Sequence, residues 1–238
     1  MTDESELAIR RLRQYKHPIT ENLDPEVSAS IPAYRSAGVV LPLFIANDGQ
    51  LRVLLTVRAS RLSSHGGDTA LPGGRFELGD QSIEETARRE AMEEIGLPKD
   101  SKQVSRLCIM ETFLSANELA VTPIVVLTTQ NIIQRLVPNE SEVAQLFTVP
   151  LKAFLYHKPP LSLEKAMQVS PIDQRRAQIL PGRRRDEPNS VPGADASESH
   201  WHTVYQVSWL GEQLKRHTFW DQRNPIRGLT RFVVLFLI

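Results

Sequence analysis

Three carboxylates crowd into five consecutive positions of the segment TARREAMEEIGL, namely Glu90, Glu93 and Glu94. Because each helical residue advances by about 100°, a helix here would carry one apolar stripe, made of Ile83, Ala87, Ala91 and Ile95. On the same helix Glu94 falls inside that stripe, and Glu90 and Glu93 border it at about −20° and −80° from Ile83. The three acids are therefore predicted to face a partly desolvated boundary.

Like charges at such a boundary are costly unless a cation neutralises them. Oxygen ligands without cysteine favour Mg²⁺, with Mn²⁺ as a substitute. The three glutamates are therefore candidate metal ligands, and Arg89 is placed to pin Glu90 and orient it. An ordinary acidic helix surface with incidental arginines is the alternative that this helix alone leaves open.

Two glycines, Gly73 and Gly74, precede the helix in the segment LPGGRFELGD. Glycine lets a backbone approach a ligand closely and expose an amide or a carbonyl to it. A glycine pair after a proline is, taken alone, more often just a turn. The pair gains weight only together with the carboxylates that follow it.

Taken together, the segment GGRFELGDQSIEETARREAMEEIGL resembles the Nudix box, and the nine positions from Arg89 to Leu97 follow that pattern without a gap. One departure is that Gln81 stands where the general box has Glu, with Asp80 beside it and one extra residue after Gly74. The coenzyme A pyrophosphatase branch of the family typically shows this lengthening and an Asp at the shifted place. The departure therefore favours that branch over an inactive site.

The preceding segment, LLTVRASRLSSHGGDTALPGG, resembles the signature of the same branch. Arg58 and Gly67 match it, whereas Ser63 stands where a second Arg is expected and Leu71 replaces Phe. Arg61, two places earlier, is a candidate for the missing charge, and a plain surface role for it is equally open. A 3′-phosphorylated ADP group needs several cationic donors. The predicted substrate-binding residues are Arg58, Arg61, Gly67, Gly73 and Gly74.

Later segments, AVTPIVVL, NESEVAQLFTVPL and GLTRFVVLF, resemble the fungal and peroxisomal coenzyme A diphosphatases. Members of the family use a further Glu from a distant loop as metal ligand or base. Glu142 matches that Glu best and Glu140 is second, although each alone is more often an ordinary loop acid.

The resemblance implies metal-dependent hydrolysis of coenzyme A, or of its acyl or oxidised forms, to 3′,5′-ADP and 4′-phosphopantetheine. The implied ligands of Mg²⁺ or Mn²⁺ are Glu90, Glu93, Glu94, Gly74, Glu140 and Glu142. Glu90 or Glu142 would take the proton of the attacking water, and Arg89 would assist. Two alternatives stay open: another nucleoside diphosphate derivative as substrate (ADP-ribose, a dinucleoside polyphosphate or an oxidised deoxynucleoside triphosphate), or a non-catalytic Nudix binding module.

The composition narrows the class of partner. Acidic and basic residues balance at 28 each, which favours a small-molecule substrate over nucleic acid. The single cysteine, Cys108, excludes an internal disulfide and suits a reducing compartment. The pattern predicts neither a secretory signal nor a membrane span, and the last three residues are not of the Ser-Lys-Leu kind. The prediction is an intracellular protein, cytoplasmic, mitochondrial or peroxisomal, of open oligomeric state.

The elements needed to position these residues suggest an α+β protein. Two β-rich runs meet at Asp48-Gly49, a hairpin signal, and the periodic segment 82–95 is helical. The resemblance implies the Nudix fold, a mixed β-sheet sandwiched between α-helices (α/β/α). The predicted segments are an N-terminal helical extension, a Nudix core, a flexible Pro/Arg/Ser-rich insertion and a closing strand and helix that complete the domain: 1–33, 34–156, 157–199 and 200–238.

Overall fold

The computed structural model describes nine stretches or single positions of the chain, namely 1–16, 33–115, 119–156, 158, 160, 162, 201–209, 212–221 and 224–226. Most of the predicted insertion at 157–199 lies outside these residues, and so does the closing helix predicted beyond Ile226. The division of the chain into four segments therefore stays a prediction.

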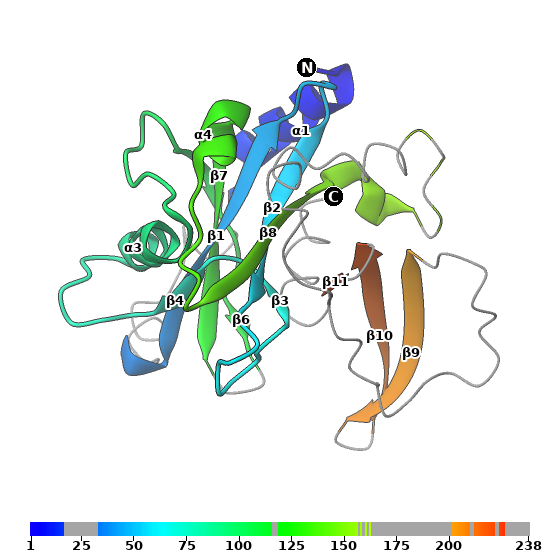
Figure 1. The fold of residues 1–238 in the computed structure, drawn as a ribbon. Coiled ribbons are helices and arrows are strands. Elements are labelled where there is room, and N and C mark those ends of the chain that lie inside the picture. The colour runs from blue at the N-terminus through cyan, green and yellow to red at the C-terminus, as the bar shows by residue number, and fades with distance from the viewer. Residues whose placement is uncertain are drawn as a thin grey trace.

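One mixed sheet forms the centre of the molecule (Figure 1). Its main path runs β3-β2-β1-β7-β5, with the bounds Thr69–Ala70, Leu51–Arg58, Ser36–Ile45, Ala120–Thr129 and Ser105–Ile109. Three further strands attach to it: β4 (Gly73–Arg75) to β1, β6 (Phe113–Leu114) to β7, and β8 (Val143–Pro150) to β2. Strands β1 and β7 are parallel, and the other pairings are antiparallel.

The predicted hairpin is confirmed in β1 and β2, which pair with Leu43 opposite Val53. At the turn, Gly49 has φ +80°, a conformation that glycine adopts without a steric penalty. The Asp48 side chain accepts a hydrogen bond from the Gln50 amide at 3.0 Å. The turn sequence therefore sets the register of the two strands, and with it the position of the β2 end that carries Arg58.

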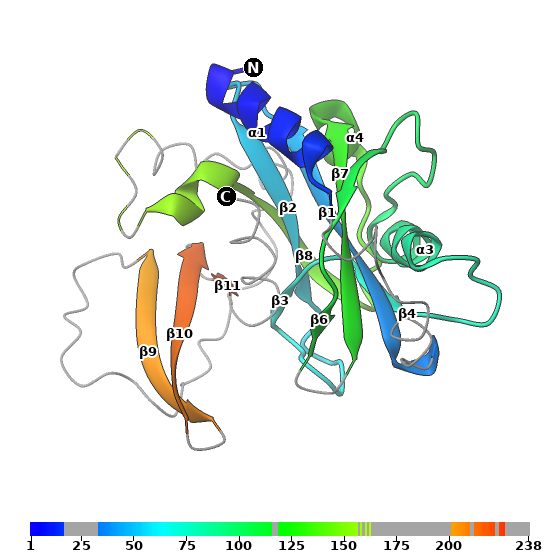
Figure 2. The same cartoon turned by 180° about the vertical axis from the view of Figure 1, so that it is seen from behind.

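Helices cover both faces of this sheet (Figures 1 and 2). On one face lie α1 (Asp3–Gln14) and the 3₁₀ turn η2 (Leu151–Leu155), and on the other lie α3 (Ile83–Ile95) and α4 (Gln130–Arg135). A short 3₁₀ turn, η1 (Ala33–Arg35), leads into β1. Two hydrophobic clusters fill the space, one on each face. The fold is therefore the predicted α+β arrangement with a mixed sheet between helices.

Helix α3 has the span that its sequence predicts. Ser82 caps its first turn by accepting a hydrogen bond from the Glu85 amide at 3.2 Å, and Gly96 ends it with φ +71°. The helix approaches β1 closely at Gly38, where a Cβ would stand 2.4 Å from the Ile83 carbonyl oxygen. Because no side chain separates the two elements there, β1 and its partner β4 fix the position of the carboxylates on α3.

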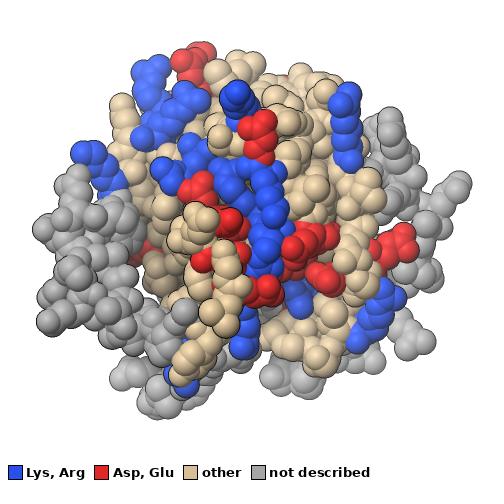
Figure 3. All heavy atoms as spheres, turned by 90° about the vertical axis from the view of Figure 1, so that its left-hand side faces the viewer, with Lys and Arg blue, Asp and Glu red and all other residues tan. Residues whose placement is uncertain are grey.

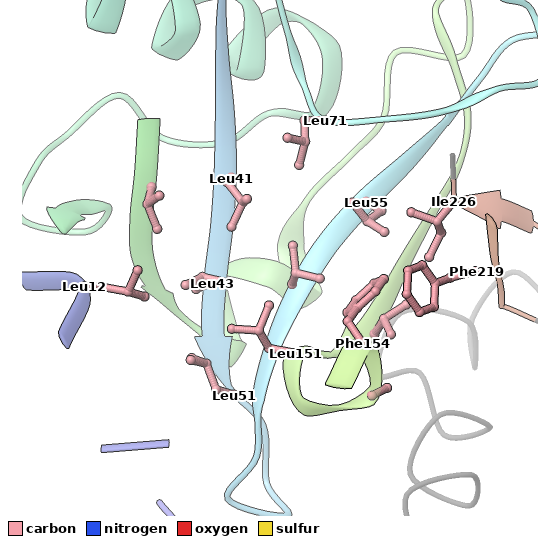
Figure 4. Packing of buried hydrophobic residues seen from close by; sticks show 14 of the residues in the cluster. Leu12, Leu41, Leu43, Leu51, Leu55, Leu71, Leu151, Phe154, Phe219 and Ile226 are labelled. Carbon is pink, nitrogen blue, oxygen red and sulfur yellow. The ribbon is translucent and has the colours of Figure 1, made fainter. Parts of the chain in front are cut away.

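A second, antiparallel sheet follows the insertion: β9 (His202–Trp209), β10 (Glu212–Asp221) and β11 (Asn224–Ile226). A strand predicted within 200–238 is thus present as β9, whereas β10 and β11 were not predicted. Aromatic packing joins this sheet to η2, because the Phe154 ring lies against that of Phe219 (Figure 4), with 5.0 Å between their centroids. The Phe154 centroid also lies 5.4 Å from that of Trp201. The Trp201 indole also donates to the Ala153 carbonyl at 3.0 Å.

Phe154 and its neighbour Leu155 provide a matched test of this packing. Phe154 is 4% exposed and Leu155 is 58% exposed. We expect Phe154→Ala to lower the free energy of unfolding by about 3–5 kcal/mol because it leaves a cavity between the two sheets. Leu155→Ala should change it by less than about 1 kcal/mol. Chemical denaturation of both variants measures the difference, and equal losses would contradict the packing described.

Candidate active site

Glu90 and Glu94 of α3 lie directly against the Gly73-Gly74 backbone of β4. The Gly73 amide donates a hydrogen bond to Glu94 Oε2 at 3.0 Å. A Cβ placed on Gly74 would stand 2.4 Å from the carboxyl carbon of Glu90. A side chain at position 74 would therefore displace Glu90, so the glycine serves the close approach that the sequence predicted.

Glu94 is 6% exposed, as expected for an acid inside the apolar stripe. Burial raises its pKa to about 7; the Gly73 amide and Arg58 oppose this shift, while the charges of Glu90 and Glu142 add to it. Burial is also the main cause that raises the pKa of Glu90, with Arg89 acting in the opposite direction. Two carboxylates are thus held together where water solvates them poorly.

The guanidinium of Arg89 contacts the carboxylates of this site directly. Its guanidinium forms a two-pronged pair with Asp80, Nε to Oδ1 and Nη2 to Oδ2, each at 3.0 Å. Its Nη1 donates to Glu90 at 3.1 Å and to Glu93 at 3.3 Å. The pair with Arg89 lowers the pKa of Asp80 and raises that of Arg89.

Asp80 was not among the residues predicted for the site, although the sequence marked it by its offset in the box. Its side chain is 5% exposed and also accepts a hydrogen bond from the Thr86 hydroxyl at 2.8 Å. Asp80 therefore joins the Arg89 guanidinium to the first turn of α3, and Arg89 in turn contacts Glu90.

Glu93 has a different environment from Glu90 and Glu94, because its side chain is 54% exposed. The face around α3 shows acidic side chains with basic ones running between them (Figure 3).

The loop between α4 and β8 carries both distant candidates, Glu140 and Glu142, and it docks on the end of α3. The Asn139 amide donates to the Glu94 carbonyl at 2.8 Å. The Asn139 side chain also donates to Glu142 Oε1, at 3.4 Å. Glu142 is partly buried and its charge raises the pKa of Glu94, whereas Glu140 is exposed. The fold thus brings Glu142 to the carboxylate pair, and Asn139 is a contributor that the sequence did not indicate.

The two candidate arginines have different surroundings. Arg58 ends β2 with its Nη1 4.0 Å from Glu94 Oε1 and its side chain 31% exposed. Arg61 donates instead to backbone carbonyls, from Nη2 to Glu140 at 2.6 Å and from Nε to Ser141 at 3.4 Å. Gly67, also predicted to bind substrate, has φ +80° and donates its amide to the Arg58 carbonyl at 3.0 Å. A turn is enough to explain this glycine.

A cavity of about 630 Å³ lies elsewhere, between α1 and η2. Leu12, Leu51, Cys108, Met110 and Leu151 are among its lining residues, and all five belong to the hydrophobic cluster on the face away from α3. Burial raises the pKa of the Cys108 thiol to about 11, so the thiol stays protonated, as expected of a core residue. This cavity shares no lining residue with the carboxylate site.

Comparison with known proteins gives the family. A model described as the NUDIX domain matches residues 35–169, more than half of the 238-residue chain. The chain belongs to the NUDIX family. The predicted resemblance to the Nudix box is therefore confirmed, and the sheet between helices described above is a Nudix fold.

Three relatives illustrate the range of Nudix proteins that this chain resembles. It is 42% identical over 121 residues to Nudix hydrolase 15, mitochondrial, of Arabidopsis thaliana, covering 51% of this chain and 42% of that protein. It is 34% identical over 181 residues to peroxisomal coenzyme A diphosphatase 1 of Saccharomyces cerevisiae, covering 66% and 52%. It is 40% identical over 136 residues to the Nudix hydrolase NudL of Pectobacterium atrosepticum, covering 56% and 68%. The chain thus spans about half or less of the first two relatives.

The donor atoms of the site fit a hard divalent cation. Glu90, Glu94 and the Gly73-Gly74 carbonyls offer oxygen ligands only, and Arg58 and Arg89 offset in part the negative charge of the half-buried Glu90 and the buried Glu94. Among the residues that the structure describes, no three His, Cys, Asp or Glu side chains gather closely enough to hold an ion by themselves. The predicted ligand roles therefore all remain predictions, for Glu90, Glu93, Glu94, Gly74, Glu140 and Glu142. Within the same residues, no helix has the length and apolar character needed to cross a membrane.

The raised pKa of Glu94 predicts how stability depends on pH without divalent cations. The folded value, about 7, lies above the ordinary 4.5, so the stabilising contribution of the protonated group is lost as the pH rises through 7. Glu94→Gln removes this titration. We expect the free energy of unfolding of the native chain to fall between pH 5 and pH 8 by about 1–3 kcal/mol more than that of Glu94→Gln.

Denaturation with a chelator present measures this gain, and Glu93→Gln is the matched control because Glu93 is exposed. Adding Mg²⁺ at pH 8 should then stabilise the native chain more than Glu94→Gln, since a cation relieves the charged carboxylate. An equal effect of pH on all three proteins would contradict the desolvation of Glu94.

Proposed function

We propose that this chain is a divalent-cation-dependent hydrolase that cleaves the diphosphate of coenzyme A, or of its acyl or oxidised forms, into 3′,5′-ADP and 4′-phosphopantetheine. The observation that carries the hydrolase proposal is the pair of poorly solvated carboxylates, Glu90 and Glu94, against Gly73 and Gly74. The choice of substrate is supported by the signature-like segment 54–74 and by the name of the yeast relative.

Glu90, Glu94 and the backbone of Gly73 or Gly74 are the groups proposed to hold Mg²⁺ or Mn²⁺. When bound, the cation offsets charge on the diphosphate and makes the attacking water more acidic. Arg89 orients Glu90 through its hydrogen bond at 3.1 Å, and Asp80 keeps Arg89 in place. The same network holds the carboxylates near one another in the free protein, so little reorganisation is needed on binding.

Glu142 is the residue that we assign as general base. Glu90 is packed against Gly74, paired with Arg89 and assigned above to the cation, so its oxygens are engaged and are poorly placed to reach the attacking water. Glu142 lies on a separate loop that reaches the same end of α3, and it is partly exposed. A carboxylate in that position can accept the proton of the attacking water directly.

Arg58 is the cation proposed to contact a phosphate group of the substrate. Its guanidinium is partly exposed and lies 4.0 Å from Glu94, so an anion bound there would sit beside the carboxylate pair. Arginine is suited to this because it presents several donors in one plane. The substrate is a small molecule in this proposal, and an intracellular compartment, cytoplasmic, mitochondrial or peroxisomal, remains the prediction from the sequence.

A second candidate function keeps the chemistry and changes the substrate to ADP-ribose, a dinucleoside polyphosphate or an oxidised nucleoside triphosphate. It is favoured by one observation: the guanidinium of Arg61 is bound to the carbonyls of Glu140 and Ser141, while Ser63 replaces the second Arg of the signature. Arg58 is then the main candidate left for binding the 3′-phosphate of coenzyme A, a group that needs several cationic donors. A non-catalytic module is disfavoured because the box carboxylates are retained.

Identification of the products decides between these substrates. Incubation with Mg²⁺ and coenzyme A, an acyl ester, ADP-ribose, a dinucleoside polyphosphate or an oxidised nucleotide is followed by mass spectrometry. We expect coenzyme A or its ester to give 3′,5′-ADP and a phosphopantetheine, with no turnover in excess chelator. Glu94→Gln serves as the inactive control, with a loss of at least about 100-fold. Preferential cleavage of a nucleotide would overturn the coenzyme A assignment.

Glu142 and Glu140 allow a matched test of the base. They lie on one loop, but Glu142 is partly buried near Glu94 and Glu140 is exposed. We expect Glu142→Gln to lower kcat by about 10²–10⁴-fold because the proton acceptor is lost. Glu140→Gln should retain kcat within about twofold. The reverse order would move the role to Glu140, and near-normal turnover of both would exclude this loop as the source of the base.

A further inference from the structure

Three hydrogen bonds tie the segment after β2 to the loop of Glu142. Arg61 donates to the carbonyl of Glu140 at 2.6 Å and to that of Ser141 at 3.4 Å. The Ala59 amide donates to the carbonyl of Glu142 at 2.8 Å. The carbonyls of three successive loop residues thus bind to two residues of one segment, although about eighty positions separate the partners in the sequence.

The other side of the same loop is bound to α3. The Val137 amide donates to the Ile95 carbonyl at 3.2 Å, and the Asn139 amide donates to the Glu94 carbonyl at 2.8 Å. The loop therefore lies between the helix that carries the carboxylate pair and the segment that begins at Arg58. Its position depends on both attachments, and only one of them uses a charged side chain.

We propose that Arg61 is a positioning residue, which holds the 139–142 loop so that the Glu142 carboxylate stays beside Glu94. This inference rests on the proposed function, because Glu142 acts as base there. A guanidinium suits the task, since its planar fork binds two neighbouring carbonyls at once and keeps its charge at every physiological pH. This positioning role takes the place of the substrate-binding role that the sequence suggested for Arg61.

The proposal also links substrate binding to the chemistry. Arg58 and Arg61 lie in one turn of chain, in which the Gly67 amide donates to the Arg58 carbonyl and the Leu62 amide to the Ala59 carbonyl. A phosphate that orders Arg58 would therefore steady the attachment of the Glu142 loop as well. Misplacement of a catalytic group by about 1 Å can reduce turnover about 100-fold, so the attachment matters for kcat more than for binding.

The first test compares Arg61→Ala and Arg61→Lys with Arg135→Ala, a control on the exposed last turn of α4, just before the loop. We expect Arg61→Ala to lower kcat by about 10- to 100-fold with KM changed less than about threefold. Arg61→Lys should recover part of kcat. Hydrogen exchange of peptides covering 137–143 should quicken in substrate-free Arg61→Ala, while α3 peptides and Arg135→Ala stay unchanged.

A double-mutant cycle with Glu142→Gln separates positioning from other roles. If Arg61 acts through Glu142, Arg61→Ala should cost little further kcat in the Glu142→Gln background. A full additional loss there, or a raised KM with unchanged kcat and unchanged exchange, would overturn the proposal in favour of direct substrate binding. Hydrogen exchange is measured without substrate, so unchanged exchange in Arg61→Ala would refute the role of Arg61 in holding the loop and would leave the proposed function untouched. Normal turnover of Glu142→Gln refutes the role of Glu142, and the positioning proposal with it.

Discussion

The close approach of two carboxylates to a glycine pair is the constraint on which the site depends. Glu90 occupies the space that a side chain at Gly74 would fill, and Glu94 accepts a hydrogen bond from the Gly73 amide. The approach is possible because α3 lies on β1 at Gly38, whose absent side chain leaves room for the first turn of the helix. Backbone contact between a helix and two strands therefore places the charged groups, and loop conformation has little part in it.

This arrangement leaves the free protein with electrostatic strain that the neighbouring cations relieve only in part. Arg89 pairs with Asp80 more closely than with Glu90, and Arg58 is 4.0 Å from Glu94. Desolvation therefore still raises the pKa of both glutamates. A protein that keeps two such groups together sacrifices some stability, and a divalent cation with a diphosphate is the kind of ligand that would recover it.

The site residues that come from distant segments are placed by hydrogen bonds of a loop and not by packing of a helix on strands. The loop of Glu142 reaches the site because its amides bind the last carbonyls of α3, groups that a helix end leaves without partners inside the helix. Arg61 binds the same loop from the side of β2. The segment of Arg58, proposed to bind substrate, is therefore attached to the loop of Glu142, proposed to accept the proton. The carboxylate pair, in contrast, lies on a helix.

Features that depend on short-range geometry could be predicted from the residue types alone: the span of α3, the hairpin at Asp48-Gly49, and the place of Glu94 inside the apolar stripe. These follow from helical periodicity and turn chemistry, which act over a few residues. The carbonyl partners of Arg61 and the packing of Phe154 against Phe219 are known only from the fold. Both depend on how the chain brings together groups that are more than sixty residues apart, which no local pattern of residue types encodes.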